Sequence, residues 1–67
     1  MTSPLYKIRK DEKLTLQQVS IQIGLDAGNL SRIERGKQAA SPLIAEKLSK
    51  LFGGRISEIE ILYPERF

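Results

Sequence analysis

The fold of this chain is decided by residues 14–37, which read LTLQQVSIQIGLDAGNLSRIERGK. Thr15 and Gln18 stand at the spacing of a capping box, so a helix is predicted to begin just after Thr15. Gly24 ends that helix, and Asp26 is the predicted N-cap of the next one. The connection between the two helices is therefore only three residues long, which forces them to cross sharply.

A sharp crossing of this kind sets steric conditions that the sequence meets. It needs a small residue where one helix passes over the other, a turn residue that tolerates a positive φ, and apolar residues that clamp the pair. Ser20 and Gly24 satisfy the first two conditions. The predicted clamp consists of Val19, Leu25, Leu30 and Ile33. These features indicate a helix-turn-helix unit over residues 15–35. Gly36 marks the end of its second helix.

Three further helices carry boundary signals of the same kind. Ser3-Pro4 and Ser41-Pro42 each place an N-cap before a proline at the first helical position, and Ser57 begins a second capping box. The predicted ends are about Lys13, Gly53-Gly54 and Pro64. Apolar residues follow the helical period in every segment. We therefore predict one compact all-α domain of five helices over residues 1–67, with the helix-turn-helix unit at its second and third helices.

The composition excludes most catalytic and metal-binding chemistry. The 67 residues include neither Cys nor His, which removes thiol nucleophiles, imidazole bases and the usual zinc or iron ligands. The sequence thus indicates no enzyme, no cofactor, no metal and no evident small-molecule ligand. The net charge of +3 favours a polyanionic partner. Because no apolar run suits a membrane span or a signal peptide, we expect a cytoplasmic protein without a membrane partner.

The third-helix ending LSRIERGK at residues 30–37, together with the helix-turn-helix unit, resembles the lambda-repressor/Cro-type helix-turn-helix family, also called the xenobiotic-response-element family. The resemblance covers residues 5 to about 62. It implies a bacterial or phage transcription regulator, most similar to the short Cro-like repressors, that binds a palindromic operator in double-stranded DNA as a homodimer. One departure is Leu16, where the family commonly has a glutamine that bonds a phosphate. Either residues next to Leu16 make that phosphate contact instead, or Leu16 is a partly buried hydrophobic residue that packs at the start of the helix as a hydrophobic staple.

With the third helix in the major groove, the face opposite Leu30 and Ile33 would meet the bases. The predicted base-reading residues are Ala27, Gly28, Asn29, Ser31 and Arg32. Arg32 can bond guanine O6 and N7 together, although a phosphate contact or a solvated side chain is the alternative. Asn29 either pairs with adenine or bonds a phosphate or its own helix. Gly28 either allows close approach to DNA or is a tolerated first-turn position. Such a face predicts sparse direct readout, with operator shape contributing much of the specificity.

Phosphate contacts are predicted at the start of the second helix and after the third. The candidates are Thr15, Gln17, Arg35, Lys37, Gln38 and Ser41. Lysines of the first helix are interpreted as a solvated basic face. Arg9 and Glu34 stand where the family often places a buried ion pair between its first and third helices, and two separate surface charges are the alternative.

The C-terminal residues 55–67 are the candidate dimer segment. The proposed contacts are Ile59, Leu62, Tyr63 and Phe67, because the segment holds more apolar side chains than one short helix buries. A tail that folds back to complete the core is the alternative. The apolar, acidic character of this segment also suggests a second function for the same fold. In that case the chain is a protein-interaction module, antitoxin-like or coactivator-like, with DNA binding secondary.

Overall fold

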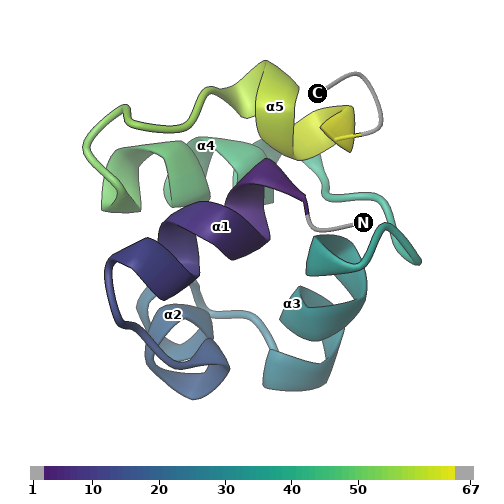
Figure 1. Cartoon of the computed structure of the whole chain (residues 1–67). Coiled ribbons are helices and arrows are strands. Elements are labelled where there is room, and N and C mark those ends of the chain that lie inside the picture. The colour runs from purple at the N-terminus through teal and green to yellow at the C-terminus, as the bar shows by residue number, and fades with distance from the viewer. Residues whose placement is uncertain (1–2, 65–67) are drawn as a thin grey trace.

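The computed structural model describes residues 3–64 and contains within them five α-helices and no strand (Figure 1). The helices are α1 (Pro4–Asp11), α2 (Leu16–Ile23), α3 (Ala27–Glu34), α4 (Pro42–Leu51) and α5 (Glu58–Leu62). The prediction of an all-α, five-helix fold is confirmed.

Each helix begins directly after the residue that the sequence predicts as its N-cap. The side-chain oxygen of every cap accepts a hydrogen bond from a backbone N–H two or three positions later, which satisfies a donor that has no partner within the helix. The five caps are Ser3, Thr15, Asp26, Ser41 and Ser57. At Thr15 and Ser57 the capping box is complete in both directions.

The first four helices end with a residue in the left-handed conformation. In three of them this residue is a glycine, namely Gly24, Gly36 and Gly53. In α1 it is Lys13 (φ 59°), whose N–H bonds to the carbonyl of Lys10 at 3.0 Å. The N–H of Leu14 bonds to the carbonyl of Arg9 at 3.1 Å, which completes a Schellman motif. For this reason α1 ends at Asp11, two residues before the predicted end.

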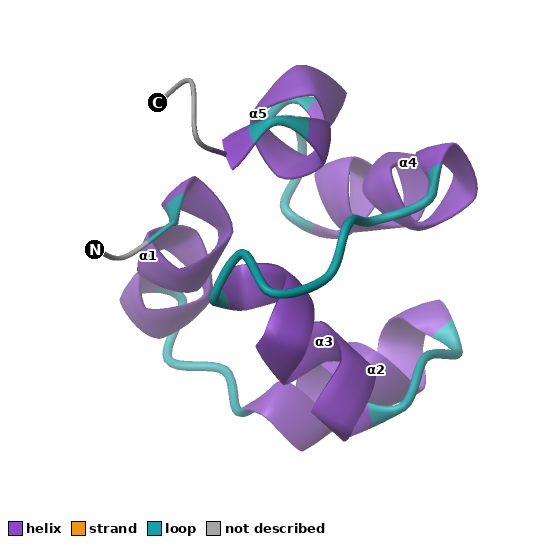
Figure 2. Cartoon of the chain, turned by 90° about the vertical axis from the view of Figure 1, so that its right-hand side faces the viewer, coloured by secondary structure: helices purple, strands orange, loops and turns teal. Residues whose placement is uncertain are grey.

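All five helices contribute to one hydrophobic core. Helix α2 packs on α3 at one end of the molecule, α4 packs on α5 at the other, and α1 lies between the two pairs (Figures 1 and 2). Leu30 from α3 and Leu48 from α4 are fully buried. The other buried apolar residues are Leu5, Ile8, Val19, Ile23, Ile33, Ala40, Ala45, Phe52, Ile56 and Ile61. Burial of each large side chain contributes about 1.5–3 kcal/mol, so the core fixes how α3 is presented.

Exposed polar contacts tie the loop between α4 and α5 to the end of α1. Arg55 forms ion pairs with Asp11, at 2.8 Å from Nη2 to Oδ2, and with Glu12. The hydrogen bond to Asp11, followed by the one to Glu12, raises the pKa of Arg55 above its ordinary value. The hydroxyl of Ser49, which lies in α4, donates to the carbonyl of Ile56 in the same loop at 2.8 Å. These contacts set the path by which the chain enters α5.

Candidate nucleic-acid interface

The turn between α2 and α3 has the geometry that a tight helix crossing needs. Gly24 adopts a left-handed conformation (φ 70°, ψ 34°), as its place in the sequence predicts. The N–H of Leu25 bonds to the carbonyl of Ser20 at 2.9 Å, and the buried Ser20 hydroxyl donates to the carbonyl of Gln17 at 3.0 Å. A larger side chain at Ser20 would push the helices apart. The turn therefore holds α3 at a fixed angle to α2.

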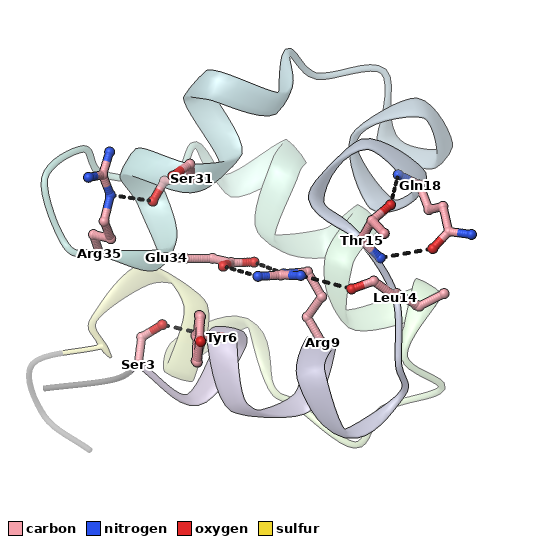
Figure 3. Close-up of polar contacts among 9 residues, drawn as sticks. All are labelled: Ser3, Tyr6, Arg9, Leu14, Thr15, Gln18, Ser31, Glu34 and Arg35. Atoms are coloured by element: carbon pink, nitrogen blue, oxygen red, sulfur yellow. Dashed lines mark hydrogen bonds and ion pairs between the residues drawn. The ribbon is translucent and has the colours of Figure 1, made fainter.

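A buried ion pair locks α3 to α1 (Figure 3). Nε of Arg9 lies 2.6 Å from Oε2 of Glu34, and Nη2 lies 3.0 Å from Oε1. The remaining nitrogen, Nη1, donates to the carbonyl of Leu14 at 2.8 Å, and the ring of Tyr6 lies 5.5 Å from the guanidinium carbon. Arg9 is 6% exposed and Glu34 is 4% exposed. The two residues thus form a buried, bidentate pair and not two separate surface charges.

The opposite face of α3 is turned to solvent. Leu30, Ile33 and Glu34 are buried. The residues on the other side are Ala27, Gly28, Asn29 and Ser31, which are half-buried, and Arg32, which is exposed. The structure therefore brings all five predicted base-reading residues to the accessible side of one helix. A helix with one locked face and one accessible face has the form that inserts into a DNA major groove.

Arg32 belongs to a side-chain cluster that sequence reasoning missed. Its Nε donates to Oε1 of Gln38 at 3.1 Å, and its Nη2 donates to Oδ1 of Asn29. Gln38 comes from the loop after α3, where the sequence suggested only a phosphate contact. At the start of the helix the carboxylate of Asp26 accepts from the N–H of Gly28 at 2.9 Å. The sequence gives no signal for the Arg32–Gln38 contact, because it depends on how the loop returns toward the helix.

Two of the predicted phosphate contacts are also helix caps. Thr15 accepts from the N–H of Gln18 at 3.1 Å (Figure 3), and Ser41 accepts from the N–H of Ile44 at 3.2 Å. Each hydroxyl keeps its own hydrogen for donation to a phosphate. Gln17 is exposed on α2.

The basic candidates lie at and just beyond the end of α3. Arg35 Nε donates to the carbonyl of Ser31 at 3.4 Å (Figure 3), and Lys37 is exposed. Within residues 3–64 neither Arg35 nor Lys37 forms an ion pair. Their charges are therefore available to a polyanion. Lys10 and Lys13 line an open depression beside the start of α2.

Leu16 and the apolar residues of the C-terminal segment differ in how far they are buried. Leu16 is half-buried and packs against the core, in agreement with a staple. Ile59 and Tyr63 are 56% and 44% exposed, whereas Leu62 packs against the core. Phe67 lies outside the described residues. The segment thus divides into a part that completes the core, which includes the buried Ile61, and a part that faces solvent.

The described part of the chain was compared with the requirements of a metal site and of a membrane-spanning helix, and it meets neither. Residues 3–64 contain no cluster of three or more side chains able to hold a metal ion. In the same range no helix has the length and apolar character to cross a membrane.

Comparison with known proteins identifies the family. The family model for helix-turn-helix domains matches residues 5–59, a span that includes α1 to α4, the Arg9–Glu34 pair and the start of α5. No curated protein and no solved structure matches the chain significantly. The match covers most of the sequence, and the fold, the α2–α3 turn and the accessible face of α3 agree with it. The chain belongs to the lambda-repressor/Cro-type helix-turn-helix family of DNA-binding transcription regulators.

Proposed function

We propose that this protein is a small Cro-like repressor that binds a palindromic operator in double-stranded DNA as a homodimer. The observation that carries the proposal is the presentation of α3. The Arg9–Glu34 pair and the core hold its inner face, while Arg32 and small polar or apolar side chains occupy its outer face. An α-helix fits the major groove of B-DNA, where every base pair shows a distinct pattern of donors and acceptors. The direct test is selection of duplexes from a random library by the wild-type protein.

In this proposal the outer face of α3 reads bases with few side chains. Arg32 makes the principal contact, Asn29 and Ser31 lie beside it, and Ala27 and Gly28 bring the helix close to the bases. Ala27 offers a methyl group to a thymine methyl. Because few long polar side chains are available, the deformability and groove width of the operator supply much of the specificity.

Phosphate contacts flank this face in the proposal. They are made by Thr15, Gln17, Arg35, Lys37 and Ser41, which lie on α2 and after α3. Such contacts fix the register of the protein on DNA and contribute affinity without regard to sequence.

Lys37→Ala is expected to weaken binding to specific and random DNA by the same factor. Loss of one phosphate contact from each half-site lowers the slope of log affinity against log salt by about 0.9 per contact, and so by about 1.8 for the dimer, since fewer counterions are released. Titrations between low and physiological salt measure this slope. Lys50→Ala is the matched control, because Lys50 is an exposed lysine of α4 that pairs with Glu46 at 3.0 Å. Equal slopes for both variants and the wild type would contradict the phosphate role of Lys37.

The dimer interface in the proposal is the exposed part of α5. A single domain of this size spans only a few base pairs, so useful specificity needs two copies on half-sites about one DNA turn apart. Ile59 on α5 and Tyr63, the residue that caps its end, present apolar surface, and a twofold axis would bring each patch onto its copy. Leu62, which packs against the core, is assigned to the edge of this interface, and Phe67 stays a candidate contact outside the described residues.

Ile59→Glu is expected to weaken dimerisation by roughly tenfold or more, because it replaces apolar contact with two like charges across a twofold axis. The helix should persist, since a glutamate in the first turn is favourable. Sedimentation equilibrium measures the change. Leu43→Glu is the control, as Leu43 is an equally exposed apolar residue on α4. If Leu43→Glu dissociates the dimer and Ile59→Glu does not, the interface lies on α4 and this part of the proposal is wrong.

The exposed apolar part of α5 also favours a second candidate function. A protein-interaction module would use Ile59 and Tyr63, flanked by the acids Glu58 and Glu60, to bind a different protein chain. DNA binding would then be secondary. A selected DNA pool that stays random would favour this candidate.

A further inference from the structure

The Arg32 guanidinium is held between the helix and the following loop. Asn29 lies one turn earlier on α3 and accepts from Nη2, and Gln38 lies in the loop and accepts from Nε at 3.1 Å. An exposed arginine has many rotamers open to it, and two acceptors on different segments select one orientation. In the structure these two contacts thus give the end of the side chain one orientation in the absence of DNA.

Gly28 lies between the guanidinium of Arg32 and the helix cap, Asp26. A Cβ atom at this position would lie 3.7 Å from Nη1 of Arg32, an ordinary van der Waals contact that leaves the arginine where it is. The same Cβ would lie 2.8 Å from Oδ2 of Asp26, closer than carbon and oxygen atoms pack. That carboxylate accepts from the N–H groups of Gly28 and Asn29, at 2.9 and 3.3 Å. A side chain at Gly28 would therefore displace the helix cap.

The contacts with Asn29 and Gln38 also determine which N–H donors of Arg32 remain available to DNA. Arg32 has five N–H donors, of which one on Nε goes to Gln38 and one on Nη2 goes to Asn29. Both donors of Nη1 and one of Nη2 are left. Guanine shows two acceptors, O6 and N7, on its major-groove edge, whereas adenine and cytosine each show a donor and thymine a methyl group. A fixed pair of donors therefore matches guanine alone.

We propose that Asn29 and Gln38 are positioning residues for Arg32 and that each chain reads one guanine through the Nη1–Nη2 end of this arginine. The inference rests on the proposed function, in which α3 enters the major groove. It gives Gln38 a different role from the phosphate contact that the sequence suggests. It also places Asn29 beside the reader and not on an adenine.

The two roles of Gln38 have different consequences for binding. A phosphate contact changes the affinity for every DNA sequence by the same factor. A positioning residue changes the preference for guanine over the other bases at one position, and leaves the salt dependence as it was. Base preference at that position is therefore the readout that separates them.

The experiment begins with a site selected from random duplexes by the wild-type protein. The guanine to test is the one whose preference is lost in Arg32→Ala. Affinities are then measured for the selected site and for the three duplexes that carry another base pair there. Gln38→Leu is expected to reduce the preference for guanine by roughly twofold to tenfold, with the salt slope unchanged. Gln38→Glu keeps an acceptor for Nε and is expected to retain the preference, while its negative charge lowers the affinity for all four duplexes.

Gln22→Leu is the matched control, because Gln22 is an exposed glutamine of α2 outside the cluster, and its base preference should equal that of the wild type. If Gln38→Leu weakens binding to all four duplexes equally and lowers the salt slope, Gln38 is a phosphate contact and the inference is overturned. The same follows if the selected site contains no guanine that depends on Arg32. Failure to select any site would instead refute the proposed function itself.

Discussion

Arg9→Ala is expected to lower the free energy of unfolding by about 3–5 kcal/mol. The substitution leaves the carboxylate of Glu34 buried without its bidentate partner and removes the donor to the Leu14 carbonyl. A domain of 67 residues has a total stability of roughly 3–10 kcal/mol, so this loss is a large part of the whole. Urea denaturation followed by circular dichroism measures it, and DNA affinity should fall together with the folded fraction.

The matched control for Arg9→Ala is Arg55→Ala. Arg55 also has two acidic partners, but all three side chains are exposed to solvent, so its loss should cost much less. A double-mutant cycle adds a second check, because Arg9→Ala should be far less harmful when Glu34 is already alanine. If Arg9→Ala unfolds at the same urea concentration as Arg55→Ala, the pair does not hold α3 in place.

Arg32→Ala is expected to remove most of the direct base reading that distinguishes the operator from random DNA. A bidentate contact between arginine and guanine is worth about 1–3 kcal/mol, which corresponds to roughly 5-fold to 150-fold in the ratio of specific to random affinity for each half-site. The stability of the fold should change little, because Arg32 is exposed and its partners are exposed or half-buried. Fluorescence anisotropy with the selected duplex and a shuffled duplex measures the ratio.

Arg32→Lys separates charge from geometry in this test. Lysine keeps the positive charge but lacks the planar pair of donors that meets O6 and N7 together. Affinity for random DNA should therefore recover while the preference for guanine stays low. A variant Arg32→Ala that retains the wild-type ratio would show that another residue reads the operator.

The starts of the helices could be predicted from the sequence because capping is local chemistry. Thr15 with Gln18, and Ser57 with Glu60, carry the complete signal within four residues. The end of α1 could not be predicted in the same way. Lys13 adopts the left-handed conformation that glycine usually adopts at a helix end, and a lysine in the sequence does not indicate this conformation.

The site was predictable in part. The accessible face of α3 follows from helical periodicity, since Leu30 and Ile33 fix which side is buried. The pairing of Arg9 with Glu34 came from the family resemblance, because 25 residues separate them in the chain. The contact of Arg32 with Gln38 depends on the course of the loop between α3 and α4, in which Ala40 is buried in the core. No local pattern encodes such a course.

The C-terminal helix shows the limit of periodicity in a short element. Ile61 is buried while Ile59 and Tyr63 are exposed, and the five residues of α5 are too few for an apolar stripe to identify the inner face. The packing of α5 on α4 decides which isoleucine enters the core. Only the structure separates the residues that complete the core from those available to a partner.

The most direct test of DNA reading by α3 is selection from a random duplex library at physiological salt, with the recovered pool sequenced. We expect an enriched palindrome whose half-site centres lie about one DNA turn apart, with a guanine in each half that is lost when Arg32→Ala is used for the selection. A pool that stays random, with binding that disappears steeply as salt rises, would show only nonspecific charge attraction and would contradict sequence-specific regulation by this chain.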